Sequence, residues 1–406
     1  MVIRQQYLDQ LIQLQDQPLI KVITGIRRSG KSTLLDQFRQ HLLQQGVSPD
    51  RVISLNFEAQ ENEFLLDRHR LHDYLTAQLL PDQKNYIFLD EIQNVPQFEK
   101  LVDSLFIKTN VDLYITGSNA FLLSSELATL LSGRYLEINL LPFSFAEYLQ
   151  AQPSSATTDL HLSLDRFLHT SAFPQAVTLS RLAPDQALNY TRTIYQTVVT
   201  KDIGQRQRIK HPHTFDHLTK FLLDNLGNPT SPHNLARTLS TTDSQLDSRL
   251  IERYLSALAS SYVFYPVSRF DIRGKQHLNT QEKYYTVDLG FRQALIGKTT
   301  AQDLGHLLEN LVYLELRRRG GCIYLGKLDQ KEVDFVVQQA DGSLSYYQVA
   351  YTAKDPDTLK RELTPLQKIP DNYPKYLLTT DPLSFDQDGI QHFNVCHWLL
   401  HPDASC

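Results

Sequence analysis

The stretch from residue 21 to residue 35 constrains the fold of this chain more than any other. An apolar run leads into Gly25, and after four further residues Gly30 is followed directly by Lys31 and Ser32. This G-x-x-x-x-G-K-[ST] spacing is typical of a loop that joins a buried strand to a helix and surrounds a phosphate with main-chain N–H groups. The sequence therefore predicts a strand, a phosphate-binding loop and a helix. A glycine-rich turn that binds nothing is the alternative interpretation.

Each part of the predicted loop has a separate task. Small residues let the backbone approach an anion, and the start of the following helix adds a partial positive charge. Lys31 would place a full charge beside the outer phosphates, and the Ser32 hydroxyl would bind Mg²⁺. The residues predicted to contact the nucleotide are Gly25, Ile26, Arg27, Arg28, Ser29, Gly30, Lys31, Ser32 and Thr33.

Two adjacent acids, Asp90 and Glu91, end a second apolar run and supply what hydrolysis requires. The carboxyl ends of parallel strands are where ligands bind in open α/β sheets. We therefore expect Asp90 to hold Mg²⁺ through water and Glu91 to polarise the attacking water, as a Walker B pair. Two adjacent acids alone also fit a solvated turn. Their place behind a strand, about 60 residues after Lys31, favours the Walker B interpretation.

Further polar residues are candidates for the same site. Ser118 and Asn119 follow a third predicted strand, so either side chain could contact the γ-phosphate or the attacking water, although Gly-Ser-Asn is also a plain turn sequence. Arg134 stands where the nucleotide domain ends. It could neutralise γ-phosphate charge within its own chain or across a subunit contact, or it could form a surface ion pair.

The alternation of short apolar runs and amphipathic stretches predicts an α/β domain over residues 1–150, with a parallel sheet covered by helices on both faces. A Glu beside the Walker B Asp favours the P-loop division with an extra strand between the two motif strands. Residues 151–159, with proline, serine and threonine, predict a linker. At 406 residues the chain is too long for one core, so we expect further domains over residues 151–298 and 299–406.

The middle part has the outline of a helical linker followed by a winged helix. Helices are predicted over residues 215–226, 233–239 and 246–258, and extended runs follow at 263–270 and 284–287. Residues 195–298 contain 14 Lys and Arg against 9 Asp and Glu. The residues that would contact DNA are Arg249 and Arg253 on the third helix and Arg269, Arg273 and Lys275 on the hairpin. A rigid spacer or a protein dock is an equal alternative.

The C-terminal part places an acid on a helix (residues 304–319), an acid on one strand and a polar group on the next, joined by an Asp-Gly hairpin signal. Metal-dependent nucleases share this arrangement, with E-x-K on the last strand. The corresponding residues here are Glu309, Asp334 and Gln348. Because Gln348 binds magnesium only weakly and Ala350 cannot position water, we expect a degenerate site in a retained scaffold.

Composition narrows the class of protein. No apolar run reaches the 18 or so residues of a membrane span and residues 1–9 are polar, so a cytoplasmic protein is expected. The three cysteines, Cys322, Cys396 and Cys406, are odd in number and lack paired ligand spacing, which supports neither a disulfide framework nor a zinc site.

Taken together, the motifs carry a resemblance that extends over nearly the full length of the chain. It is similar to the bacterial AAA-like ATPases in which a P-loop module is joined to a C-terminal domain of unknown function. The stretches that carry the resemblance are residues 21–35, 88–94, 116–119, 131–148, 173–174, 201–203, 283–290, 305–313 and 332–336.

The resemblance implies ATP binding and hydrolysis with Mg²⁺, a winged-helix middle, and an end similar to restriction-type nucleases. On matching positions, Lys31 and Ser32 would hold phosphate and magnesium, and Asp90 and Glu91 the metal and the water. Two places depart from the family pattern. Ser171-Ala172 replaces glycines before Phe173, and Gln348 and Ala350 replace the Glu and Lys of the nuclease pattern.

The preferred hypothesis is an ATPase that moves its winged-helix and nuclease-like domains. Adenine is expected because the chain lacks the guanine-reading N-K-x-D and T-K-x-D motifs. The alternatives are a slow nucleotide-gated switch that signals to a protein partner, and an ATP-dependent DNA-processing nuclease. DNA, a protein partner and self-association all stay open as interactions.

Overall fold

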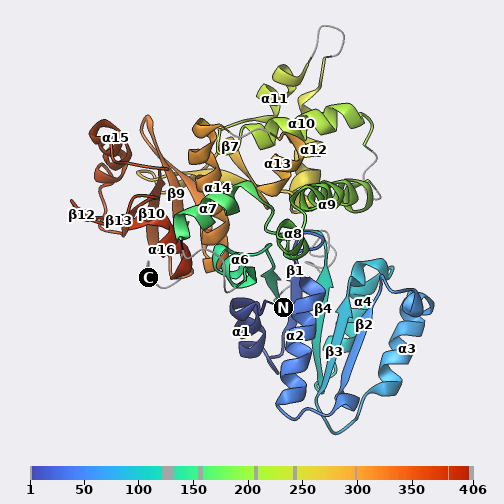
Figure 1. Ribbon diagram of the computed structural model, residues 1–406. Coiled ribbons are helices and arrows are strands. Elements are labelled where there is room, and N and C mark those ends of the chain that lie inside the picture. Colours follow the sequence, from blue (N-terminus) through green and yellow to red (C-terminus); the bar gives the residue numbers. More distant parts are fainter. Residues whose placement is uncertain are drawn as a thin grey trace. The chain divides into compact units, whose positions relative to one another are not determined.

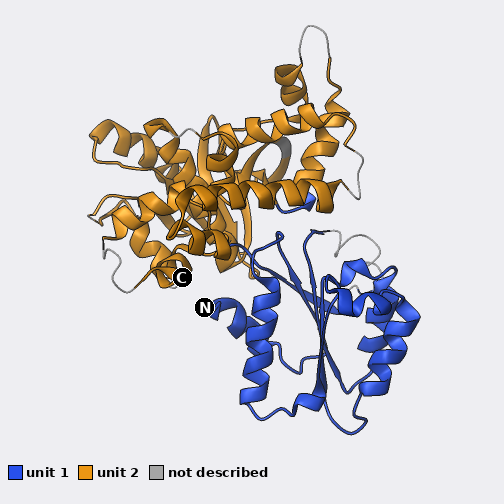
Figure 2. Cartoon of the chain, turned by 45° about the vertical axis from the view of Figure 1, so that its right-hand side comes forward, with its two compact units in different colours: residues 1–142, 260–262 blue, residues 143–259, 263–406 orange. Residues whose placement is uncertain are grey.

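The computed structural model describes residues 2–120, 131, 133–153, 159–204, 209–240, 245–297, 300–382 and 384–401. Most of the predicted linker (154–158) and Cys406 lie outside this range. The chain forms two compact units (Figure 2). Unit 1 is residues 1–142 with 260–262, and unit 2 is residues 143–259 with 263–406. Within the described range, no helix combines the length and apolar character needed to span a membrane.

Unit 1 is built on a five-stranded sheet in the order β2-β3-β4-β1-β5, with all neighbouring strands parallel (Figure 1). β4 therefore lies between β1 and β3, the two strands that precede the motifs, and the predicted extra strand is confirmed. The elements are α1 (Gln5–Gln13), β1 (Ile20–Thr24), α2 (Lys31–Gln44), β2 (Val52–Asn56), α3 (Arg68–Gln78), β3 (Asn85–Asp90), α4 (Phe98–Phe106), β4 (Val111–Gly117) and β5 (Tyr135–Asn139). Short 3-10 turns lie at Pro49–Arg51, Gln60–Leu65 and Ile92–Asn94.

Helices cover both faces of this sheet, which explains why its central strands are buried and mostly apolar. On one face α1 and α2 contribute a core that includes Leu11 and Phe38. On the other, α3 and α4 contribute Leu71 and Leu101. Every residue of β1 and of β3 is buried. Because the strands are parallel, their carboxyl ends meet at one edge of the sheet, and the motif residues follow those ends.

Unit 2 begins with helices and ends with a mixed sheet (Figure 1). Its helices are α6 (Phe145–Ala151), α7 (Leu160–His169), α8 (Pro174–Ser180), α9 (Pro184–Thr197), α10 (Pro212–Asp224), α11 (Pro232–Leu239), α12 (Ser248–Ser260), α13 (Gly290–Leu295), α14 (Leu304–Arg319), α15 (Pro356–Gln367) and α16 (Val395–Leu400). A π-helical turn at Val198–Ile203 follows α9, and a 3-10 turn at Ala301–Asp303 precedes α14.

The sheet of unit 2 joins the two parts that the sequence suggests as separate domains. Its strands are β6 (Phe264–Asp271), β7 (Gln276–Thr286), β8 (Cys322–Leu328), β9 (Lys331–Gln338), β10 (Leu344–Val349), β11 (Lys375–Thr379), β12 (Asp386–Gln387) and β13 (Ile390–Asn394). Their order is β12-β13-β11-β10-β9-β8-β6-β7. The hairpin β6–β7 pairs with β8, so one sheet spans the expected boundary between residues 298 and 299. Three helices and a hairpin occur as expected, while the winged-helix assignment and the three-domain division stay predictions.

Candidate functional site

The loop between β1 and α2 adopts a backbone that only some residues tolerate. Gly25 and Gly30 have φ values of 140° and 104°, and Arg28, which is not a glycine, has a φ of 70°. A Cβ atom on Gly25 would lie 2.3 Å from the carbonyl oxygen of Leu140, so no larger residue fits there. A non-glycine residue at positive φ costs free energy, and such strain persists mainly at functional sites. The loop therefore turns tightly into the N-terminus of α2.

Lys31 is held at the centre of this loop by its own backbone. The side chain is 3% exposed, and Nζ donates to the carbonyl oxygens of Gly25 (3.0 Å) and Ile26 (3.3 Å). Nζ also lies 3.6 Å from Oε1 of Glu91. The structure thus brings together the predicted phosphate-binding lysine and the predicted catalytic glutamate, which are distant in sequence.

Asp90, at the end of β3, is surrounded by hydroxyl and amide donors. Thr116 Oγ1 donates to its Oδ1 at 2.5 Å, and Asn56 Nδ2 donates to its Oδ2 at 2.9 Å. Burial raises the pKa of the Asp90 carboxyl, and hydrogen bonds from Ser32 and Thr116 oppose that rise. The hydroxyl of Ser32 and the carboxylate of Asp90 are therefore in contact. Both are hard oxygen ligands of the kind that Mg²⁺ prefers, so the residues present fit this ion.

Glu91 is buried and held in one orientation. Its φ is 55°, and its N–H donates to Thr116 Oγ1 at 2.9 Å. Gln93 Nε2 donates to its Oε2 at 2.5 Å, and Ser118 also hydrogen bonds to the carboxylate. Burial would raise the pKa of Glu91, but the charge of Lys31 and the Gln93 hydrogen bond together outweigh burial and lower it. Glu91 is therefore a carboxylate near neutral pH, which is the form that can orient water and accept a proton.

The structure does not bring all of the predicted residues to this edge. Asn119 is 2% exposed and follows β4 at the same edge as Asp90. Arg134 lies at the opposite edge, because its carbonyl oxygen accepts from the N–H of Ile20, the first residue of β1. Its guanidinium pairs with Asp103 at 2.6 Å. The predicted contact of Arg134 with phosphate within its own chain is therefore corrected, while a role across a subunit contact stays a prediction.

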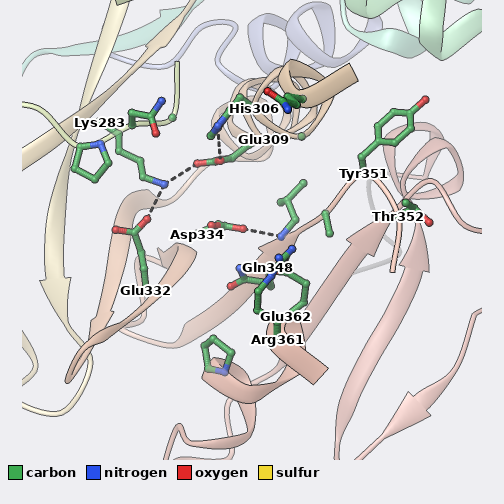
Figure 3. Close-up of a pocket in the computed structure, with 18 of the residues that line it drawn as sticks. Lys283, His306, Glu309, Glu332, Asp334, Gln348, Tyr351, Thr352, Arg361 and Glu362 are labelled. Atoms are coloured by element: carbon green, nitrogen blue, oxygen red, sulfur yellow. Dashed lines mark hydrogen bonds and ion pairs between the residues drawn. The ribbon is translucent and has the colours of Figure 1, made fainter. Parts of the chain in front are cut away.

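A second cluster of predicted residues lines a pocket of about 720 Å³ in unit 2 (Figure 3). Glu309 on α14, Asp334 on β9 and Gln348 on β10 meet there as the sequence predicts. Burial and the charge of Glu309 raise the pKa of Asp334 well above its usual range. Burial would raise the pKa of Glu309, but the charge of Lys283 outweighs it and lowers the pKa to about 2.

Lys283 on β7 is a buried cation in this pocket (Figure 3). Its side chain is 4% exposed, and Nζ lies 3.0 Å from Oε1 of Glu309 and 2.7 Å from Oε1 of Glu332. The hydroxyl of Tyr285 donates to the same Glu309 oxygen at 2.6 Å. In the part of the chain that the structure describes, no three His, Cys, Asp or Glu residues are arranged to hold a metal ion. A buried ammonium thus pairs with the carboxylates of Glu309 and Glu332 beside this pocket.

Comparison with known proteins finds three domain matches along the chain. An AAA domain matches residues 17–149, and two domains of unknown function, DUF8612 and DUF4143, match residues 162–302 and 304–398. An uncharacterised protein of Haemophilus influenzae is 39% identical over 98% of this chain and 99% of its own length. The chain belongs to the family of that protein. Uncharacterised protein MJ1544 of Methanocaldococcus jannaschii is 26% identical over 93% of this chain and 84% of its own length.

Sequence identity to the solved structures that this chain resembles is lower than to these two relatives. The Walker-type ATPase PABY2304 of Pyrococcus abyssi is 16% identical, with 73% of this chain and 96% of that chain covered and a TM-score of 0.48. Cdc6p of Pyrobaculum aerophilum is 12% identical, with 72% and 93% covered and a TM-score of 0.31.

Two residues of the AAA domain site were missed by sequence reasoning. Asn56 and Thr116 both hydrogen bond to Asp90, and Thr116 also positions Glu91. Asn56 ends β2 directly beside Asp90 in the parallel register. Both residues could have been found by looking for a polar residue at the carboxyl end of each strand, but only after the strand order was known.

Outside the AAA domain, two of the three predicted hairpin cations form ion pairs. Arg269 lies 3.0 Å from Glu332, and Arg273 lies 2.9 Å from Asp329. Arg249 and Arg253 lie exposed on α12. Of the cations predicted to contact DNA, Arg249, Arg253, Arg273 and Lys275 are exposed, and Arg269 is partly buried.

Proposed function

We propose that this protein binds and hydrolyses ATP with Mg²⁺ at the carboxyl edge of the five-stranded sheet. The observation that carries the proposal is the meeting of Lys31, Asp90 and Glu91 at that edge, beside a loop of positive-φ residues. The AAA domain match over residues 17–149 supports ATP as the nucleotide.

Binding begins with the loop. The triphosphate would take the place that the carbonyl oxygens of Gly25 and Ile26 now occupy around Lys31 Nζ, and the N–H groups at the start of α2 would add main-chain donors. Ser32 and Asp90 would hold Mg²⁺, which when bound neutralises charge on the β- and γ-phosphate oxygens.

Glu91 would orient the attacking water and accept its proton. Its position is fixed by Thr116 and Gln93, so it would need little reorganisation once Lys31 turns to the phosphates. The same contacts favour a second candidate function, a slow nucleotide-gated switch, because Glu91 pairs with Lys31 until a phosphate arrives. If the protein is an ATPase rather than a switch, we propose in addition that ATP hydrolysis moves unit 2.

The test is steady-state phosphate release by the full chain with ATP and Mg²⁺. Glu91→Gln should retain ATP affinity and lower turnover at least about 100-fold, because general-base catalysis contributes about 10²–10⁴. Turnover that does not depend on Glu91 would contradict the assigned site. Turnover below about one per minute in the unchanged protein would favour the switch, since typical enzymes turn over at about 1–10³ s⁻¹.

For unit 2 we propose a retained scaffold without nuclease activity. Lys283 occupies the centre of the carboxylate cluster, and Ala350 stands where a lysine would activate water. Linear and supercoiled DNA should therefore both survive incubation with Mg²⁺ or Mn²⁺. Cleavage that is lost in Asp334→Asn would contradict this part of the proposal.

A further inference from the structure

A buried arginine at the beginning of the chain joins two distant segments of unit 1. Arg4 is 2% exposed. Its Nη1 donates to the carbonyl oxygen of Ser29 at 3.1 Å, and its Nη2 donates to the carbonyl oxygens of Leu141 at 2.8 Å and Pro142 at 3.5 Å. The guanidinium also lies over the ring of Tyr7, 5.0 Å from its centroid. A buried charge is retained only where hydrogen bonds compensate it, so these carbonyl groups define the position of Arg4.

The first of these contacts acts on the phosphate loop. Ser29 immediately precedes Gly30, and the carbonyl of Ser29 shares a planar peptide group with the N–H of Gly30. In a trans peptide these two groups point in opposite directions, so an arginine on the carbonyl fixes where the N–H points. It also polarises that N–H, because hydrogen bonds in a chain strengthen one another. Arg4 therefore orients a main-chain donor of the loop without occupying the nucleotide site.

The second contact acts on the segment through which the chain leaves unit 1. Leu141 and Pro142 are the last residues of unit 1 before the chain enters unit 2 at Phe143. The segment also contacts the loop directly. Leu140 N–H donates to Thr24 O at 2.8 Å, and the carbonyl of Leu140 faces Gly25. One guanidinium thus bonds both to the loop that would hold phosphate and to the segment that leads to the other unit.

We propose that Arg4 couples the nucleotide state of the phosphate loop to the 141–143 connection. This inference rests on the proposed ATPase function, because it needs a ligand that changes the loop. When phosphate draws Lys31 away from Gly25 and Ile26, the Ser29–Gly30 peptide shifts, and the bidentate arginine transmits that shift to Leu141 and Pro142. Arg4 is a positioning residue: it touches neither substrate nor Mg²⁺.

The chain offers a matched control for this coupling. Gln37 on α2 holds the same N-terminal segment, since its Oε1 accepts from the N–H of Arg4 at 3.3 Å and its Nε2 donates to the carbonyl of Val2 at 2.9 Å. Gln37→Ala loosens the segment but leaves the bonds of the guanidinium. Arg4→Lys keeps the charge and most of the stem, and removes the planar fork that spans two carbonyl groups.

The experiment is hydrogen exchange of the full chain, with and without a non-hydrolysable ATP analogue and Mg²⁺. In the unchanged protein the analogue should alter exchange at Leu140, Leu141 and Phe143. Arg4→Lys should bind the analogue within about threefold of the unchanged protein and lose that response. Gln37→Ala should keep both. A response in Arg4→Lys equal to that of the unchanged protein would overturn the coupling.

A second variant keeps the test open if Arg4→Lys does not fold. Tyr7→Leu removes the ring that holds the guanidinium in place and also the hydroxyl that accepts from the N–H of Leu141 at 3.4 Å, so exchange is measured at Leu140 and Phe143. Because the guanidinium is then less firmly held, the response at these two residues should be reduced, and an undiminished response would count against the inference. Absence of any analogue binding by the unchanged protein would overturn the proposed function and this inference with it. Binding without a response at residues 140–143 would overturn the coupling alone.

Discussion

Lys31 and Lys283 are both buried ammonium groups beside carboxylates, but their surroundings give them opposite capacities. Lys31 contacts two backbone carbonyl oxygens and one carboxylate at 3.6 Å. Lys283 contacts two carboxylates, at 3.0 and 2.7 Å. Exchanging neutral carbonyls for phosphate gains charge-assisted hydrogen bonds, whereas separating Lys283 from its acids would leave buried charges unpaired. Lys31 can therefore leave its present contacts to bind an incoming anion, whereas Lys283 should keep its ion pairs.

Lys31→Ala should weaken ATP binding at least about tenfold, since a charge-assisted hydrogen bond contributes about 1.5–3 kcal/mol and 1.4 kcal/mol is tenfold in affinity. Calorimetric titration of ATP with Mg²⁺ measures the change. Lys84→Ala is the matched control, because Lys84 stands just before β3, at the opposite edge of the sheet, and hydrogen bonds to Thr109 there. If Lys31→Ala bound ATP as tightly as the unchanged protein, the assignment of Lys31 as a phosphate-binding residue would be wrong.

Lys283→Met should destabilise unit 2 by about 3–5 kcal/mol, because it leaves the buried carboxylate of Glu309 without its cation. Glu309→Gln should partly restore stability when added to Lys283→Met. The two changes remove partners of one contact, so their effects on the free energy of unfolding should not add. Denaturant unfolding of the two single variants and the double variant measures the coupling, and additivity would show that the ion pair is not the stabilising contact.

At the scale of elements, Asp288 ties the start of α13 to the segment before α8. Its carboxylate accepts from the N–H of Ala172 at 2.6 Å and also from Ser171 and Gly290. A Cβ on Gly290 would lie 2.5 Å from Ser171, so the two segments touch through a glycine. Ser171, which departs from the glycine expected at this position from the resemblance, is accommodated because its hydroxyl hydrogen bonds to Asp288.

Burial raises the pKa of Asp288 to about 7, against an ordinary value of 3.8. Between these values the folded state keeps the proton that the unfolded state releases, so the contribution of this group to stability is present at low pH and is lost as pH rises towards 7. Asp288→Asn removes this loss. Its free energy of unfolding relative to the unchanged protein should therefore increase from pH 4.5 to pH 7.5, as measured by urea unfolding. A constant or falling difference would exclude the raised pKa.

Elements with a strong local signal were predictable, and those that depend on distant pairing were not. β1, the loop and α2 follow from one motif whose glycines fix the backbone. β5 was missed because it is an edge strand with Leu136 and Glu137 exposed, which breaks the apolar run. Lys283 was missed for a different reason: its partner Glu309 is 26 residues away and meets it only through the fold.

For the candidate site, the sequence predicted the residues proposed to contact nucleotide and metal, but it did not predict the residues that hold them in position. Lys31, Ser32, Asp90 and Glu91 come together as expected. Thr116 and Arg4 act through contacts between strands and segments that no spacing reveals. Arg134 was predicted as a site residue from its place in the sequence, but that place does not indicate at which edge of the sheet the residue lies.

At the scale of the whole molecule, the chain carries its own reporter of coupling between the units. Trp398 is the one tryptophan in the sequence, and it is fully buried in unit 2. The guanidinium of Arg319 lies over its ring, 3.8 Å from the centroid. Its fluorescence therefore follows the unfolding of unit 2, while circular dichroism follows both units. ATP would bind unit 1, so any effect of nucleotide on the tryptophan signal has to pass through the chain from one unit to the other.

An ATP analogue with Mg²⁺ at about 100 times its dissociation constant should stabilise unit 1 by about 2.7 kcal/mol. If the units are coupled, the thermal midpoint detected by Trp398 should rise together with the midpoint detected by circular dichroism. In Lys31→Ala, which should bind the analogue at least about tenfold more weakly, both midpoints should rise less at the same ligand concentration, and this comparison controls for effects of the salt and the ligand on the solvent. A rise confined to the circular dichroism signal would mean that nucleotide stabilises the AAA domain alone. The proposal that ATP acts on unit 2 would then fail while the proposal that ATP binds would stand.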